Sequence, residues 1–202
     1  MTDKSAVRSG YHHGSLPAAL TAAALELLDE QGLEKVTVRE VARRAGVSPG
    51  APFRHFADRQ ALLTAVADLI LEDLEQWQRA QVAAAEAPAT RAIGLGFVRY
   101  AIRHPHRFEL VKSSVYRPDQ PASVRARVTG LERAFTDLIV ADQESGTLRP
   151  GDPALVALAG QALVYGLSQM IVDGFLPAAE AEHLSEQVLD LFGIGIAHIP
   201  PT

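Results

Sequence analysis

The sequence predicts an all-α protein of about nine helices, and three observations lead to this prediction. Apolar residues recur at helical spacing along most of the chain, and almost no segment alternates apolar and polar residues as a half-buried strand does. Caps, glycines and prolines stand where helices would begin and end. Hydrophobic residues make up 48% of the 202 residues, which is enough to bury a core.

The first helix is expected to begin after Ser15 and to end before Gly32. Ser15 is a residue type that caps helix N-termini. Gly32 stands where a residue with positive φ closes a helix, and Leu33 can make the apolar contact that accompanies such an ending. One side of this helix is apolar and carries Leu16, Leu20, Ala24, Leu27 and Leu28.

The second and third helices are short and are separated by a tight turn. Thr37–Glu40 is a capping box, in which the hydroxyl and the carboxylate each satisfy a free backbone N–H, and this helix ends at Gly46. Ser48-Pro49 is a typical start of the next helix, which is only about two turns long because Asp58 caps the helix that follows. The spacing suits a helix-turn-helix, although an ordinary turn between two helices has the same pattern.

Six further helices are expected after this region. One runs from Asp58 to near Pro88. The other five cover residues 89–103, 105–115, 121–143, 153–173 and 178–197, with prolines and glycine-containing loops between them. We expect two domains, a helix-turn-helix domain over residues 1–60 with an N-terminal arm, and a helical domain over residues 61–202.

A stretch of 19 residues without a charge, 154–172, is long enough to span a membrane. Polar residues lie inside it, and Asp152 and Asp173 flank it where Lys or Arg would be expected. A helix buried on more than one side therefore explains it better than a membrane span. The first 14 residues contain no apolar run of the signal-peptide type, and there is no cysteine, so we expect a cytoplasmic protein without disulfides.

The net charge of −5 conceals an uneven distribution. Residues 1–60 contain eight Lys and Arg against seven Asp and Glu, whereas the remainder contains 11 against 17. The segment Lys35–Arg59 holds six basic and two acidic residues and is the one local concentration of positive charge. A nucleic-acid surface needs such a segment, although a solvated basic face has the same composition.

The run VTVREVARRAGVSPGAPFRHFADRQALL, residues 36–63, resembles the DNA-binding signature of the TetR/AcrR family of transcription regulators. Tyr11-His12-His13-Gly14 and Gly50-Ala51-Pro52 are similar to the subgroup that has a WHG-type C-terminal domain. Beyond residue 64, the segments 148–153 and 164–167 also resemble this subgroup. The resemblance implies an N-terminal three-helix DNA-binding domain followed by a helical domain that binds a ligand and dimerises.

The resemblance also implies which residues contact DNA. Thr37 would hold a backbone phosphate, Arg39 would reach a base edge, and the third helix would enter the major groove. Phe53 stands where the family usually has Tyr, so its ring would pack this helix against the first helix without making the hydroxyl contact. The DNA-binding residues are then Thr37, Arg39, Ser48, Pro49, Gly50, Ala51, Phe53, Arg54, His55 and Arg59.

Bulky residues of the C-terminal part could line an effector cavity or simply fill the core. They are Phe97, Tyr100, Phe108, Tyr116, Phe135, Tyr165 and Met170. The resemblance implies an effector, which we expect to be hydrophobic or aromatic. Residues 153–173 and the following amphipathic helix resemble the two dimerisation helices of the family, so we expect a homodimer.

No catalytic constellation is recognisable in the sequence. His12-His13 and His104-Pro105-His106 lack the spacing and carboxylate support of a metal site, so we expect no metal and no cofactor. A phosphate-binding loop and a nucleophile elbow are also missing, which argues against an enzyme. The sequence thus predicts a repressor that binds pseudo-palindromic double-stranded operator DNA and is released by a small molecule. The alternative is a helical small-molecule-binding or scaffold protein without operator binding.

Overall fold

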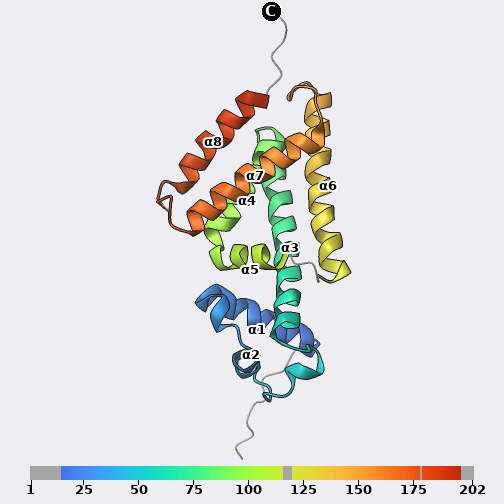
Figure 1. Ribbon diagram of the computed structural model, residues 1–202, viewed down its shortest axis with the longest axis vertical. Coiled ribbons are helices and arrows are strands. Elements are labelled where there is room, and N and C mark those ends of the chain that lie inside the picture. The colour runs from blue at the N-terminus through green and yellow to red at the C-terminus, as the bar shows by residue number, and fades with distance from the viewer. Residues whose placement is uncertain (1–14, 116–119, 178, 197–202) are drawn as a thin grey trace, which may run out of the picture.

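A computed structural model describes residues 15–115, 120–177 and 179–196. These residues form eight α-helices and two 3₁₀ turns and contain no strand, which confirms the all-α prediction (Figure 1). In chain order the elements are α1 (Leu16–Gln31), η1 (Leu33–Lys35), α2 (Val38–Arg44), η2 (Pro52–Arg54), α3 (Arg59–Ala84), α4 (Ala89–Arg103), α5 (Pro105–Val115), α6 (Ala122–Glu144), α7 (Pro153–Val172) and α8 (Ala181–Ile196). The ranges expected for α4 to α8 agree with these bounds to within three residues.

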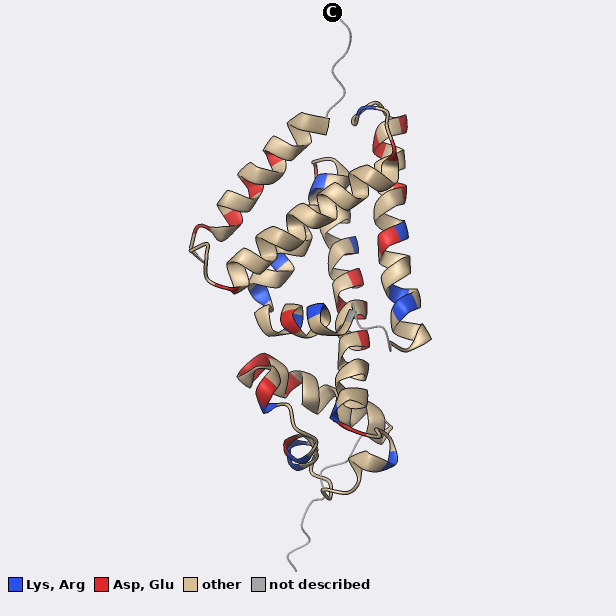
Figure 2. Ribbon diagram, in the orientation of Figure 1, with Lys and Arg blue, Asp and Glu red and all other residues tan. Residues whose placement is uncertain are grey.

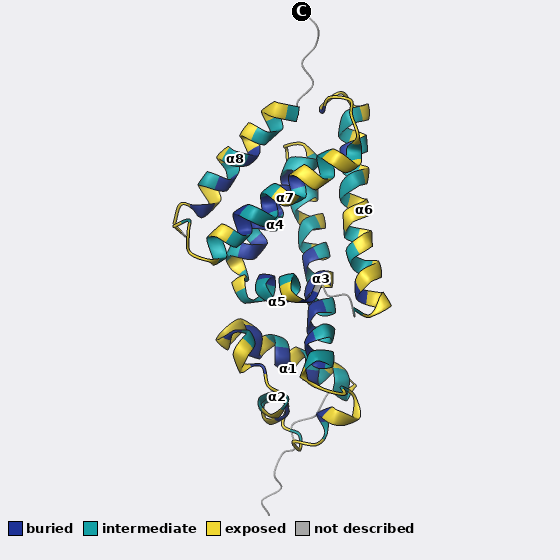
Figure 3. Cartoon of the chain, viewed as in Figure 1, coloured by how far each residue is buried: buried dark blue, intermediate teal, exposed yellow. Residues whose placement is uncertain are grey.

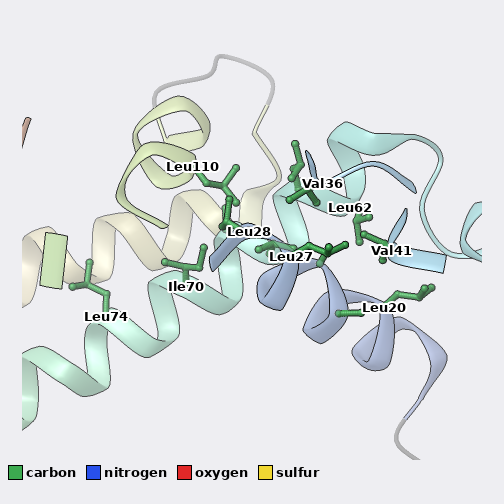
Figure 4. Packing of buried hydrophobic residues seen from close by; sticks show 14 of the residues in the cluster. Leu20, Leu27, Leu28, Val36, Val41, Leu62, Ile70, Leu74 and Leu110 are labelled. Carbon is green, nitrogen blue, oxygen red and sulfur yellow. The ribbon is translucent and has the colours of Figure 1, made fainter. Parts of the chain in front are cut away.

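Residues 15–58, which we call the head, pack around the first half of α3. Leucines of the inner face of α1 meet Val41 of α2 and Leu62 of α3 in one buried cluster (Figure 4). Leu20, Leu27 and Leu28 have no exposed surface, as the apolar side expected for this helix requires. The cluster also contains Tyr100 and Leu110, so the core of the head continues into the helices above it.

Two glycines with positive φ shape the head. Gly32, at φ 80°, ends α1 and donates its N–H to the Leu28 carbonyl at 2.9 Å. Gly46, at φ 69°, follows α2 and donates to Arg43 at 3.2 Å. Both endings were expected from the sequence, because residues with a β-carbon rarely adopt this conformation.

Helix α3 joins the head to the rest of the molecule, residues 89–196, which we call the body (Figure 1). It has 26 residues and is therefore about 39 Å long. The Asp58 side chain accepts from the Ala61 N–H at 2.8 Å, which confirms the expected cap. Its buried residues lie where it passes the head and α5, as the dark segment of Figure 3 shows.

Helix α4 is the centre of the body and packs against α3, α7 and α8. It approaches α3 closely at Gly96, where a β-carbon would lie only 2.8 Å from Gln81 Cγ. The Trp77 Nε1–H donates to the Gly96 carbonyl at 2.8 Å. On the other side, Arg91 and Arg99 bind acidic residues of α8, which has no Lys or Arg of its own (Figure 2).

Helix α7 is only partly buried. By length and composition it is the one helix within the described ranges that could cross a membrane, yet only 22% of its most apolar 18-residue window is buried. Leu155 and Leu158 are 64% and 63% exposed. Within the single chain α7 packs against α4, α6 and α8 and keeps exposed apolar residues, so its burial on more than one side stays a prediction that depends on a second copy.

Candidate DNA-binding head and effector cavity

The N-terminus of α2 forms one half of the expected capping box. The Glu40 N–H donates to the Thr37 hydroxyl oxygen at 3.2 Å. The reciprocal bond of a capping box, from the Thr37 N–H to the Glu40 carboxylate, does not form. The Thr37 N–H instead donates to the Lys35 carbonyl, and the Glu40 carboxylate accepts from Arg43. The bond from Arg43 also holds the pKa of Glu40 below its ordinary value.

Residues 48–56, which we call the recognition segment, form a shorter element than expected. The sequence predicts about two helical turns, whereas the structure has a turn followed by the three-residue η2. The Ser48 carbonyl accepts from Ala51 at 3.0 Å and the Pro52 carbonyl accepts from His55 at 2.9 Å, both with three-residue spacing. Pro52 has no N–H, so it cannot donate to Ser48 as an α-helix would require, and the tighter spacing is the result.

The recognition segment presents apolar groups to solvent. Pro49 and Gly50 are exposed, Ala51 is half-buried, and the Phe53 ring is 58% exposed. The expected packing of Phe53 against α1 is wrong. Pro52 is buried and Phe56 packs against the cluster of the head, so these two residues hold the segment in place.

Three arginines in and next to the head, Arg43, Arg44 and Arg59, are already engaged. Arg44 lies 2.8 Å from the Glu30 carboxylate and 3.6 Å from that of Glu26. Arg59 donates from two guanidinium nitrogens to the carbonyls of Val36 and Leu33, each at 2.6 Å. Arg59 therefore fixes the loop between α1 and α2 and is less available to a phosphate than the sequence suggests.

Arg39, Arg54 and His55 are the expected DNA contacts that remain exposed and carry no ion pair within the described residues. Arg39 lies on α2, before the exposed apolar groups in the chain, and Arg54 and His55 directly follow Phe53. The head therefore combines exposed apolar groups with two arginines that have no ion pair among the described residues.

A partly open cavity of about 720 Å³ lies between α3 and the body helices α4, α5, α6, α7 and α8. Five of the seven bulky residues singled out from the sequence line it: Phe97, Tyr100, Phe108, Phe135 and Tyr165. Met170 is 44% exposed and is not part of the lining, and Tyr116 lies outside the described residues. The Phe108 ring contacts those of Phe97 and Tyr165, at centroid distances of 6.2 and 5.6 Å.

Several lining residues could not be singled out from the sequence. Phe192 and the aliphatic residues Leu71, Leu131, Ile139 and Val164 lie on faces that equally suit an ordinary core. The cavity also has polar groups: Arg91 is paired with Asp190 at 2.6 Å, and the Lys112 ammonium donates to the Gln169 amide oxygen at 2.8 Å. The lining is mostly apolar with a few polar groups, as is typical of small-molecule sites.

Within the described parts of the chain, no group of three His, Asp or Glu side chains could hold a metal ion. His12 and His13 lie outside those parts. His106 lies over Gly32, where a β-carbon would be 3.3 Å from the ring, and its Nδ1 is 3.6 Å from Glu109. His106, which belongs to α5, therefore packs against the end of α1.

Two family models match the chain. The model described as bacterial regulatory proteins, tetR family, matches residues 20–66. The model described as tetracyclin repressor-like, C-terminal domain, matches residues 90–192, which is about half of the chain.

Similar proteins include the tetracycline repressor protein class A from transposon 1721 of Escherichia coli, 40% identical over 57 residues. That match covers 28% of this chain and 26% of the relative. The regulator BetI of Rhizobium meliloti is 38% identical over 77 residues, which are 38% of each protein. The chain thus matches less than half of the length of these curated relatives.

Solved structures are similar over nearly the whole chain. A protein of unknown function from Rhodococcus sp. RHA1 is 30% identical with a TM-score of 0.83, and the match covers 94% of this chain and all of that one. The ketosteroid transcriptional regulator KstR2 of Mycobacterium tuberculosis is 20% identical, with a TM-score of 0.66 and coverage of 94% and 99%. The second likeness concerns the fold alone.

Proposed function

Because the chain belongs to the tetR family of bacterial regulatory proteins, we propose that it is a dimeric transcription regulator that leaves its operator when a ligand enters the body. The observation that carries this proposal is the exposed apolar recognition segment, with the unpaired Arg39 before it in the chain and the unpaired Arg54 within it. The exposed Phe53 ring is available to a partner that covers it. We assign DNA binding to a domain of residues 1–60, which includes the head, and effector binding and dimerisation to residues 61–202.

The recognition segment suits a major groove that displays thymine methyl groups. Pro49, Gly50 and Ala51 have no hydrogen-bonding side chain, so direct readout by them is limited to apolar contact. We assign Arg39, a long donor, to a guanine edge. We assign Thr37, Ser48, Arg54 and His55 to the DNA backbone, a contact that positions the head without reading sequence.

The outer faces of α7 and α8 suit a dimer interface. Leu155 and Leu158 of α7 are well exposed, and Leu191 and Ile194 of α8 are each 70% exposed. Leu158 and Ile194 also line the cavity, whereas Leu155 and Leu191 do not. Four large apolar side chains on two neighbouring helices favour burial against a second copy over exposure to water. The same interface would cover α7 in a cytoplasmic protein, without a membrane.

The cavity suits an apolar or aromatic effector. Its volume of about 720 Å³ lies inside the range of about 300–1,000 Å³ that holds drug-sized ligands. Six aromatic rings lie in its wall among a larger number of aliphatic side chains, and no group of three His, Asp or Glu that could hold a metal ion occurs among the described residues. We therefore assign the cavity to binding and not to catalysis.

The test is selection of bound duplexes from a random DNA pool, followed by affinity measurements on the selected sequence at several salt concentrations. We expect a pseudo-palindrome with half-sites about 34–36 Å apart or a multiple of that distance, and a specific affinity that falls as salt rises. Enrichment of no sequence, with flat salt dependence, would support the alternative of a binding or scaffold protein without an operator.

Control of operator binding by a ligand has its own test, because the ligand and the operator must change each other's affinity by the same factor. Coupling of about 1–3 kcal/mol weakens operator binding about 5–150-fold, and operator must weaken ligand binding by the same factor. Equal ligand affinities with and without operator would exclude this kind of control, however tightly the ligand binds.

A further inference from the structure

One hydrogen-bonded network connects the wall of the cavity to the head. Its four members are Asp29 of α1, Asp73 of α3, Tyr100 of α4 and Arg107 of α5, and we call it the Asp29–Tyr100 network. Each residue comes from a different helix. Tyr100 is the member that also lines the cavity.

Arg107 lies at the centre of the network. Its Nε and Nη2 donate to the two oxygens of the Asp29 carboxylate at 2.8 and 2.6 Å. Its Nη1 donates to Asp73 Oδ2 at 2.9 Å. A two-pronged bond between guanidinium and carboxylate fixes orientation as well as distance, so Arg107 fixes how the last turn of α1 sits against α5.

Asp73 Oδ2 accepts a second hydrogen bond, from the Tyr100 hydroxyl at 2.7 Å. Asp73 Oδ2 thus accepts from both Tyr100, which lines the cavity, and Arg107, which also binds Asp29 of the head. The phenol is largely buried, and this burial raises the pKa of Tyr100, so its hydroxyl remains a donor at physiological pH. The bond to Asp29 raises the pKa of Arg107, which keeps its charge.

The surroundings make this network the main polar link between the head and α5. The Arg107 side chain is only 15% exposed, which strengthens its bonds relative to those of a surface ion pair. Beside it, Leu110 of α5 lies next to Leu28 of α1 in the buried apolar cluster (Figure 4). Apolar contacts tolerate sliding, whereas the fork of Arg107 does not.

We propose that Arg107 is the positioning residue of the DNA-binding head and that Tyr100 makes this positioning sensitive to what occupies the cavity. The inference rests on the proposed function. A ligand that displaces α4, or that takes the hydrogen bond of the Tyr100 hydroxyl, leaves Asp73 with Arg107 alone. The guanidinium then shifts toward Asp73, and its two-pronged bond to Asp29 is strained or lost. The head of each protomer is no longer held at the angle that fits the operator.

The first experiment compares two arginines that each tie α3 to another helix. Arg107→Gln removes the bond to α1, whereas Arg127→Gln, the matched control, removes a pair between α6 and Asp68 of α3 at 2.8 Å that does not touch the head. We expect Arg107→Gln to weaken binding to the selected operator at least about 5-fold and Arg127→Gln to change it less than 2-fold. Equal effects of the two substitutions would overturn the proposal.

Loss of operator binding by Arg107→Gln must be separated from unfolding. The variant should keep its helical circular dichroism and the wild-type affinity for 8-anilinonaphthalene-1-sulfonate, an anionic dye that fluoresces when its aromatic rings occupy an apolar site. Asp29→Asn should weaken operator binding in the same way, and combining it with Arg107→Gln should add little further loss. Fully additive losses would mean that the two residues act independently and would contradict the proposal.

The second experiment uses Tyr100→Phe, which removes the shared hydroxyl and keeps the ring. Operator affinity without probe should fall toward that of the probe-saturated wild type, because Asp73 is then left with Arg107 alone. The factor by which a saturating concentration of the same probe weakens operator binding should fall at least about 3-fold. If the probe weakens operator binding by the same factor in Tyr100→Phe and in wild type, this inference is overturned while the proposed function stands. A wild-type protein that binds no operator would overturn the proposed function first, and the inference with it.

Discussion

At the scale of single residues, the head separates side chains that build it from side chains that face outward. Phe56 and Phe53 are three positions apart, yet Phe56 packs against the cluster of the head while Phe53 is 58% exposed. Arg39 and Arg44 differ in the same way, because Arg44 is bound to Glu30 and Arg39 has no ion pair within the described residues. Whether a side chain is exposed and unpaired therefore distinguishes candidate DNA contacts from packing residues better than its residue type does.

The two phenylalanines give one prediction. Phe53→Ala should leave the free energy of unfolding within about 0.5 kcal/mol of wild type and should weaken DNA binding, because the ring contributes no core packing. Phe56→Ala should lower the free energy of unfolding by about 1–3 kcal/mol through lost packing of a half-buried ring. Thermal or urea unfolding and operator titration measure both. Destabilisation by Phe53→Ala as large as that by Phe56→Ala would contradict the placement of the exposed ring.

A hydroxyl added to the exposed ring tests the DNA contact itself. Phe53→Tyr should raise affinity for operator and for random DNA by similar factors, because a phosphate contact carries no sequence information. The gain is at most about 1.5–3 kcal/mol per head. A change in the ratio of the two affinities would place this side chain against bases and not against the backbone.

The arginine pair gives another prediction. Arg39→Ala should reduce operator affinity by about 1–3 kcal/mol per half-site and random-DNA affinity by much less, since a base contact is lost. Arg44→Ala is the control, because its guanidinium is already held by Glu30; it should change both affinities little and stability by about 0–1 kcal/mol. Titrations of both variants on both DNAs at one salt concentration decide between these roles. Equal losses on the two DNAs for Arg39→Ala would assign it to a phosphate.

At the scale of elements, the turn between α4 and α5 is where the head, α3 and the body meet. His104 ends α4, and its ring lies 4.9 Å from that of Tyr100, measured between centroids. Burial lowers the pKa of His104 below its ordinary value of 6.5, and the nearby Arg107 lowers it further. The neutral ring is therefore the form that fits this junction.

A pH dependence follows from that shift. Below pH 6.5 the unfolded chain binds a proton at His104 more readily than the folded chain does, so the free energy of unfolding decreases as pH falls through this range. His104→Gln should remove this part of the decrease. Melting temperatures of wild type and variant at pH 7.5 and pH 5.5 measure it, and the wild type should lose more. An identical loss in both proteins would mean that protonation of His104 does not oppose folding.

At the scale of the whole molecule, α3 connects a head that can contact DNA with a body that contains a cavity and an unpaired apolar face. Because one helix passes through both cores, a movement of its upper half changes the position of the head (Figure 1). The dimer sets the distance between the two heads. A ligand that alters either the angle or the distance alters the fit to two half-sites at once.

The dimer can be tested at its exposed leucines. Leu155→Glu should convert the protein to a monomer at micromolar concentration and abolish high-affinity operator binding, because a carboxylate would be buried without a partner. Leu155 is 64% exposed and does not line the cavity. Arg133→Glu, at an exposed position of α6, is the control for added negative charge and should stay dimeric. Light scattering coupled to size-exclusion chromatography measures both. A dimeric Leu155→Glu protein would place the interface elsewhere.

The sequence by itself determined the helices and their ends. Periodicity marked the apolar side of α1, Asp58 capped α3, and Gly46 ended the turn after α2, because these features depend on residues close together in the chain. Most lining aromatics could also be named in advance, although the sequence alone could not separate cavity from core.

The tertiary structure decided what depends on residues that are distant in the chain. Only the folded chain shows that the Arg44 and Arg59 guanidiniums are engaged, that Phe53 faces solvent, and that α7 keeps exposed apolar residues. It also brings Asp29 and Arg107, 78 positions apart, to within 2.6 Å. Local spacing contains no information about such pairs, because the partner of a side chain is chosen by packing and not by its neighbours in sequence.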